Sequence, residues 1–288
     1  MKVVVFIGGI SAPLVYFANK IHSQQAITLL VVENSKKKKE KPIKYDDSRN
    51  IGFIEKMINY LKFRIDLKTY ARKERLRQKE TENYQSEIFE GLHNRLDTKI
   101  PTILVDNINS KEVEEQLKEI KPNLIIDHGT SLVKDHIIDL SSLALNLHWG
   151  LSPYYRGVMC SNQALINWDI NNIGVTIHKL AKKIDGGDIL GQSRIKIEPT
   201  DSIAKITSRL TLHGTNIIIN ILKVLENGGE LVFYKQDFTK GFLIKGKTWN
   251  PHLNSFINDL NKKTLSNMIQ KPSRDKVPII EFSTHNKT

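Results

Sequence analysis

The N-terminal part of the chain alternates between apolar runs and a helical pattern, and this order limits the folds available to it. Residues 2–7 form an apolar, β-branched run that ends in Gly8-Gly9. Residues 11–21 then have helical spacing, and residues 26–32 form a second apolar run. A strand, a glycine turn, a helix and a strand open a doubly wound sheet. The sequence therefore predicts an α/β fold with a Rossmann-like, mostly parallel sheet.

The glycine turn before the first predicted helix is a candidate for ligand contact. Gly9 and Ser11 would let an anionic part of a substrate approach the backbone at a helix N-terminus. The turn is not a full dinucleotide-binding fingerprint, so a plain tight turn is the competing interpretation.

The same alternation resumes further along the chain. Predicted strands are residues 102–105, 124–128, 143–148 and 231–235, and predicted helices are residues 110–120 and 202–225. Ligands of open parallel sheets bind at the carboxyl ends of the strands, so the loops after residues 128 and 148 are candidate sites.

A basic insertion, residues 36–97, separates the second and third predicted strands. The chain has a net charge of +12, and residues 36–79 carry 16 Lys and Arg against 6 Asp and Glu, a net of +10. The composition predicts helices rich in Lys, Arg, Glu and Gln from residue 51 to residue 96. Two interpretations stay open: a solvated helical excursion, or a basic arm that touches an anionic substrate or partner.

Composition bounds the rest of the chain. No run of 18 apolar residues exists, so no membrane span is expected, and the N-terminus lacks a credible signal-peptide cleavage site. Cys160 is the single cysteine, which excludes an intramolecular disulfide and fits a cytoplasmic location. We expect a catalytic domain at 1–245 and an extension at 246–288. From residue 262 the extension should be a peripheral tail, with residues 277–282 docking as an edge segment.

Two polar residues at the end of a buried strand need a partner or a task. Asn146 and His148 are two apart in residues 143–148, so they project from the same face, although a buried parallel strand is normally apolar on both faces. Residues 149–157 follow as a loop of aromatics, Pro and Gly. Further on, Asp185 lies on a tight turn between apolar residues.

Four motifs in register carry a family resemblance. They are Asn-x-His at 146–148, Leu-x-Pro-x-x-Arg-Gly at 151–157, Gly-Val-Thr-x-His at 174–178 and Asp-x-Gly-x-Ile at 185–189. Together they resemble the formyltransferases that use 10-formyltetrahydrofolate, which include glycinamide ribonucleotide, methionyl-tRNA and sugar N-formyltransferases. The match is strong over residues 121–199 and loose over residues 2–32. Members often have Pro after the His, where this chain has Trp149, and that departure affects the acceptor more than the chemistry.

The resemblance implies a role for each residue of the centre. An amine that attacks a formyl carbonyl passes through an oxyanion, which needs preorganised donors. Asn146 would donate to that oxygen, and His148 would be a second donor and proton carrier. Asp185 would orient or charge the histidine and accept, through water, a proton from the amine.

The resemblance also implies the contacts of the donor and the acceptor. The folate pterin would lie against the backbone of two loops. The residues implied there are Asp127, His128, Gly129, Thr130, Ser131, Leu132, Ile184, Gly186 and Asp188. Substrate contacts are expected at Gly9, Ser11, Trp149, Tyr155, Arg156 and His178. No metal site is expected.

Several of these assignments have competing interpretations. Asp127 and Asp188 also fit plain turn residues, and Arg156 could bind a substrate phosphate or brace its loop. His178 could touch the substrate or stand behind the catalytic carboxylate. Cys160 should begin a helix packed near the site.

The acceptor amine is the least determined part of the prediction. An amino-sugar nucleotide is our first hypothesis for two reasons. The His at the end of Gly-Val-Thr-Ile-His178 resembles the ribonucleotide and sugar branches of the family more than the tRNA branch. The stretch of about forty residues after Trp249 is also too short for a tRNA-binding barrel. The basic insertion keeps tRNA as an alternative acceptor. A formyltetrahydrofolate hydrolase would keep the same three residues. A non-catalytic RNA- or partner-binding protein on this scaffold is the alternative of another class, and a homodimer is left open.

Overall fold

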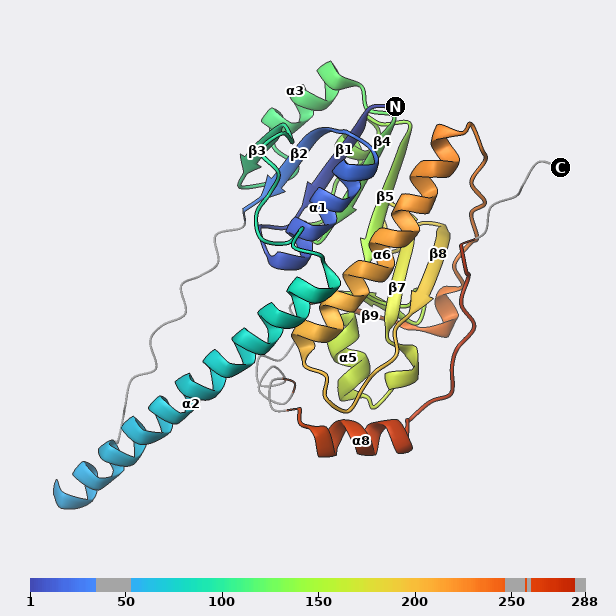
Figure 1. Ribbon diagram of the computed structural model, residues 1–288. Coiled ribbons are helices and arrows are strands. Elements are labelled where there is room, and N and C mark those ends of the chain that lie inside the picture. The colour runs from blue at the N-terminus through green and yellow to red at the C-terminus, as the bar shows by residue number, and fades with distance from the viewer. Residues whose placement is uncertain (35–52, 247–256, 258–259, 283–288) are drawn as a thin grey trace.

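The computed structural model describes residues 1–34, 53–246, 257 and 260–282. Its main sheet has seven strands in the order β3-β2-β1-β4-β5-β7-β8 (Figure 1). The strands are β1 (Val3–Ile7), β2 (Ile27–Glu33), β3 (Thr102–Val105), β4 (Leu124–His128), β5 (Leu143–His148), β7 (Gly174–Lys179) and β8 (Ile189–Arg194). A second, two-stranded parallel sheet pairs β6 (Tyr155–Gly157) with β9 (Phe242–Ile244).

The pairing of the strands confirms the predicted mostly parallel sheet. β3, β2, β1, β4 and β5 all run parallel, whereas β7 is antiparallel to both β5 and β8. The carboxyl ends of β1, β4 and β5 therefore meet at one edge of the sheet, and the chain leaves each of them into a loop at that edge.

Helices cover both faces of the sheet. The α-helices are α1 (Ala12–Gln24), α2 (Phe53–Ile88), α3 (Lys111–Ile120), α4 (Asp135–Ile138), α5 (Cys160–Ile166), α6 (Ile203–Glu226) and α8 (Lys262–Gln270), and the 3₁₀ helices are η1 (Ile170–Asn172) and η2 (Phe238–Lys240). α1 and α6 pack side by side on one face (Figure 1), and α3 and α4 cover the other. Ser110 and Ser202 cap α3 and α6 with their side chains, so both predicted helix starts are confirmed.

The alternation of side chains along each strand makes two cores. Phe17, Ile126 and Leu147 belong to the larger core under α1 and α6. Phe6 and Ile125, one residue out of phase, belong to the smaller core under α3 and α4. Because β4 and β5 have neighbours on both sides and helices on both faces, the polar side chains at their ends are held by a rigid frame.

The helical part of the insertion is a single long helix that projects from the body (Figure 1). α2 docks on the body by its C-terminal turns. Gln85 Nε2 donates to Ser208 Oγ at 3.0 Å, and Phe89, just beyond the helix, stacks on Tyr16 with ring centroids 4.2 Å apart. The predicted helical character is confirmed for residues 53–88, but it is wrong for residues 89–96, which form turns. Residues 36–52 lie outside the described residues.

Two expectations for the C-terminal third are wrong. Residues 231–235 are not a strand, because only an isolated bridge joins Tyr234 to Ile189. Residues 262–282 are not a merely peripheral tail, because Leu265 and Met268 of α8 are buried in the larger core. Their spacing of three residues puts both on one helix face. The predicted edge segment is confirmed: Gln192 of β8 donates its N–H to Ile280 O at 2.6 Å. The division at residue 245 stays a prediction.

Candidate active site

A cavity of about 550 Å³ lies at the carboxyl ends of β1, β4 and β5. Its walls come from six parts of the chain, namely Gly8 with Ser11 and Leu14, residues 127–130, residues 146–149, residues 157–162, Asp185, and Ile203 with Thr207 of α6. This is the edge at which open parallel sheets bind ligands. The cavity thus lies where the sequence places its candidate loops.

His148 ends β5 with both ring nitrogens engaged. Nε2 lies 3.0 Å from the carbonyl oxygen of Tyr155, and because a carbonyl only accepts, Nε2 carries a proton. Nδ1 lies 3.5 Å from Asp185 Oδ2 and is the nitrogen that can take up a further proton. Burial lowers the pKa of His148, and the nearby Asp185 opposes part of that shift. His148 is therefore neutral at neutral pH.

Gly150 makes room for the bond between His148 and Tyr155. A Cβ at residue 150 would lie 2.4 Å from His148 Nε2 and 2.8 Å from Tyr155 O. Only glycine lets the loop after β5 fold back onto its own histidine.

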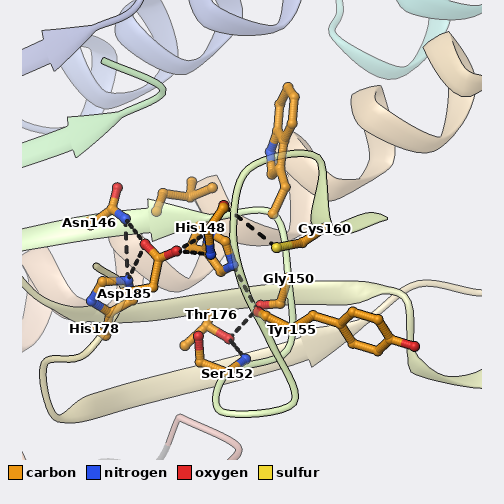
Figure 2. A network of polar contacts seen from close by, with 12 residues as sticks. Asn146, His148, Gly150, Ser152, Tyr155, Cys160, Thr176, His178 and Asp185 are labelled. Atoms are coloured by element: carbon orange, nitrogen blue, oxygen red, sulfur yellow. Dashed lines mark hydrogen bonds and ion pairs between the residues drawn. The ribbon is translucent and has the colours of Figure 1, made fainter. Parts of the chain in front are cut away.

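Asp185 is the carboxylate on which the other polar groups converge (Figure 2). Its backbone has a φ of 46°, in the left-handed region, and this conformation turns the side chain toward β5. The Gly157 N–H donates to Oδ2 at 2.5 Å. Burial alone would raise the pKa of Asp185, but His148, His178 and the Gly157 N–H outweigh it and hold the pKa below its ordinary value. Asp185 is therefore an anion in the folded protein.

His178 fixes the orientation of the Asn146 amide. Its Nδ1 lies 2.7 Å from the carbonyl oxygen of Lys179 and must donate there. When the ring carries only this proton, Nε2 accepts from Asn146 Nδ2 at 3.2 Å. The second N–H of Asn146 donates to Asp185 Oδ1 at 3.4 Å, a long hydrogen bond that a substrate oxygen could replace. His178 itself is 1% exposed, so it stands behind Asn146 and Asp185.

The N-terminus of α1 reaches the cavity from the other side. Ser11 is the N-cap residue, and its side chain makes no cap hydrogen bond. Gly8 and Ser11 line the cavity, and Gly9 has a φ of 106° with open space around it. Backbone N–H groups at a helix N-terminus attract anions, so this wall suits a phosphate.

The end of β4 and the turn after it form a polar wall of the cavity, and Trp149 continues it. Asp127, His128, Gly129 and Thr130 all line the cavity. Asp127 is not a turn residue as one interpretation had it, since it lies within β4. Burial lowers the pKa of His128 to about 4, and its ring meets the Trp149 ring edge-on at 5.0 Å.

Other predicted contacts lie outside the cavity wall. Ser131 donates both its N–H and its hydroxyl to the Glu33 carboxylate, which turns it away from the cavity. Tyr155 donates its hydroxyl to Asp169 at 2.7 Å, and the guanidinium of Arg156 packs on the Phe238 ring at 4.6 Å. The cavity wall also leaves out Leu132, Ile184, Gly186 and Asp188. Ligand contact by any of these seven residues stays a prediction.

Some lining residues carry no sequence signal of their own. Gly157 holds Asp185, and its N–H could not be anticipated from the Arg-Gly motif. Ile203 and Thr207 reach the cavity only because α6 crosses the sheet beside α1. Cys160 begins α5 as predicted, and burial raises the pKa of its thiol well above the ordinary value. The thiol is therefore uncharged at neutral pH and acts as a packing group.

The chain matches one protein family over most of its length. A model described as formyl transferase matches residues 1–222 of the 288. The chain belongs to the formyl transferase family. The match confirms the resemblance carried by the four motifs, and it extends over α2 as well.

The similar proteins of known name include formyltransferases, as the family match predicts. The chain is 33% identical over 147 residues to the bifunctional polymyxin resistance protein ArnA of Wigglesworthia glossinidia brevipalpis, covering 50% of this chain and 22% of that protein. It is 31% identical over 131 residues to the methionyl-tRNA formyltransferase of Lactobacillus acidophilus, covering 45% and 41%. The matched part thus spans less than half the length of both relatives.

Solved structures show the same fold. A sugar N-formyltransferase from Shewanella superposes with a TM-score of 0.51 at 15% identity, covering 86% of this chain and 78% of that one. Within the described residues, no helix is both long and apolar enough to cross a membrane.

Proposed function

We propose that this chain transfers a formyl group from 10-formyltetrahydrofolate to the primary amine of an amino-sugar nucleotide. The observation that carries the proposal is the convergence of Asn146, His148 and His178 on the Asp185 carboxylate at the wall of one cavity (Figure 2). This arrangement supplies an amide donor, a neutral imidazole and a fixed anion around one point, which is what acyl transfer to nitrogen requires.

Each group has a defined task in the proposed transfer. The amine nitrogen attacks the formyl carbon, and Asn146 donates to the oxyanion with the N–H whose contact to Asp185 Oδ1 is long, at 3.4 Å. His148 accepts a proton from the attacking nitrogen at Nδ1, and Asp185 stabilises the imidazolium. The protonated His148 then donates to the oxyanion or to the departing N10 of the folate. Removing one such donor typically lowers the rate by on the order of a hundredfold or more.

The proposed placement of the two substrates follows from the walls. The pterin would lie against the backbone of the turn after β4, and the acceptor would approach from the N-terminus of α1. The N-terminus of α1, which no side chain caps, supports an acceptor with a phosphate group. A cavity of about 550 Å³ is in the usual size range for small-molecule sites.

The test follows release of tetrahydrofolate by absorbance with a panel of nucleotide-linked amino sugars. We expect turnover with at least one of them, and loss of that turnover in His148→Ala and in Asp185→Ala while both variants stay folded by circular dichroism. Retained activity in either variant would refute the assigned roles. No turnover with any amine, together with tight and salt-sensitive RNA binding, would remove the proposal.

Methionyl-tRNA is the second candidate acceptor. It is favoured by α2, whose exposed side chains include Lys62, Arg64, Lys68 and Arg72 against one carboxylate, Asp66, in the same stretch. Phosphate contacts by such a helix would weaken steeply with salt. If tRNA is the acceptor, replacing the four basic residues by Gln should lower transfer to methionyl-tRNA at least tenfold. If an amino-sugar nucleotide is the acceptor, the same replacement should leave its turnover unchanged.

A further inference from the structure

A row of three polar side chains crosses neighbouring strands at the cavity. Asp127 on β4 is the register partner of Asn146 on β5, and Asn146 is the register partner of His178 on β7. Register partners leave the same face of a sheet, and neighbouring strands are about 4.8 Å apart. Asp127 therefore extends the cluster of Asn146, His178 and Asp185 by one carboxyl group, on the side of β1.

The Asp127 carboxyl is buried but faces the cavity. The residue is 6% exposed and lines the cavity wall. Thr130 Oγ1 donates to its Oδ1 at 2.5 Å, and no other hydrogen bond to this carboxyl is found among the described residues. One carboxyl oxygen thus remains for a ligand.

The charged surroundings of Asp127 set its protonation. Burial raises its pKa to about 7, and Glu33 of β2 and Asp185 act in the same direction. The Thr130 hydroxyl and His178 of β7 oppose the rise. At neutral pH the carboxyl can therefore both take up and release a proton.

Formyl transfer to a primary amine leaves two protons to place. The acceptor is an ammonium ion in neutral water, with three hydrogens on nitrogen, and the formamide product keeps one of them. The folate N10 gains one when its bond to the formyl carbon breaks, and one goes to solvent. Asp185 already accepts from Asn146 at Oδ1 and from Gly157 at Oδ2, and both histidine rings lie against it, so a second base is needed.

We propose that Asp127 is a further catalytic residue, whose free carboxyl oxygen binds the ammonium group of the acceptor and takes the first of its two protons. The inference rests on the proposed function. The neutral amine then attacks the formyl carbon, and the second proton passes from nitrogen to N10 through His148. Asp127 returns its proton to solvent before the next turnover.

The test compares two acceptors that differ in protonation. A UDP-linked amino sugar enters as an ammonium ion, whereas hydroxylamine is already neutral at pH 7. We expect Asp127→Asn to lower transfer to the amino sugar by about a hundredfold and transfer to hydroxylamine by no more than a few fold. The wild-type rate with the amino sugar should also rise with pH through about 7, and this rise should be absent in the variant. Asp139→Asn, the same change at an exposed carboxylate on α4's C-terminal end, should leave both rates unchanged.

Each outcome decides one question. Equal losses with both acceptors, or an unchanged pH profile in Asp127→Asn, would overturn the inference and leave the proposed function intact. Absence of transfer by the wild-type protein to any amine would overturn the proposed function itself. If Asp127→Asn does not fold, Thr130→Val replaces it: removal of the donated hydroxyl raises the pKa of Asp127, so the rise in rate should move to higher pH. A profile that does not move would overturn the inference as well.

Discussion

The backbone N–H of Gly157 donates to Oδ2 of Asp185 at 2.5 Å. This bond joins the loop after β5, which carries Gly157 on the short strand β6, to the loop after β7, which carries Asp185. Gly157 has a φ of 97°, and a Cβ there would lie 2.0 Å from Ile244 O on β9. The carboxylate of the proposed centre is thus positioned by a residue that can only be glycine.

Gly157→Ala should therefore reduce both stability and transfer. The left-handed conformation alone disfavours Ala by about 1–2 kcal/mol, and the contact with Ile244 must be relieved by moving β6. An ångström of displacement at Asp185 should lower the transfer rate on the order of a hundredfold. Urea unfolding and the tetrahydrofolate assay measure the two effects. Gly228→Ala is the matched control, because Gly228 has a φ of 66° with open space around it. Gly228→Ala should lose only stability. If it loses as much activity as Gly157→Ala, the Gly157 N–H does not position Asp185.

Asp185→Asn should shift the titration of His148 as well as the rate. Asp185 raises the pKa of His148 against the effect of burial, so removing its charge should lower that pKa further. The variant imidazole then takes up a proton less readily, and transfer should fall by on the order of a hundredfold or more. NMR titration of the His148 ring, assigned with His148→Gln, measures the shift. A pKa that rises or stays unchanged would contradict the assigned contact between the two residues.

Much of the fold could be predicted from local patterns. β3, β4 and β5 have the predicted boundaries, because each is a short apolar run bounded by turn residues. Residues 231–235 are also an apolar run, but they lie beside β8 and only one bridge joins them to it. An apolar run indicates that a segment is buried. Whether it pairs as a strand depends on whether a neighbouring strand has an edge free to pair with it.

The site could be predicted only where chemistry and motif coincide. Asn146 and His148 were predictable because polar side chains in a buried strand need a partner or a task. Asp185 was predictable because it belongs to a motif in the same register. Asp127 was harder to interpret, since a carboxylate before His-Gly also fits a turn. Its position beside Asn146 follows from the pairing of β4 with β5, and that pairing joins segments about twenty residues apart. Sequence spacing alone does not reveal such lateral neighbours.

Asp127→Asn should stabilise the folded protein at neutral pH. A carboxyl whose pKa rises from 3.8 to about 7 on folding favours the folded state below its unfolded pKa. That advantage is lost as pH rises through about 7, because the unfolded chain ionises more easily. The amide has no charge to bury and can still accept from Thr130. The stability gain should therefore grow between about pH 4 and pH 7 and reach up to about 4 kcal/mol. Urea unfolding across this range measures it, and a variant less stable than wild type at pH 8 would contradict the burial of an ionisable group.

His128 should make the folded protein less stable as pH falls, whereas Asp127 makes it less stable as pH rises. Its pKa falls from 6.5 to about 4 on folding because the ring is buried. The unfolded chain therefore binds more protons between these values, and stability falls as pH is lowered from about 6.5 toward 4. This one group accounts for up to about 3 kcal/mol of the loss. His128→Asn keeps a donor to Leu147 O, which Nδ1 of His128 contacts at 3.0 Å, and removes the titration. The variant should be less stable at pH 7, because it leaves space beside Phe17 and Trp149, but its stability should fall less between pH 7 and pH 5. Equal slopes in the two proteins would mean that His128 does not titrate with folding and that the acid sensitivity comes from other buried histidines.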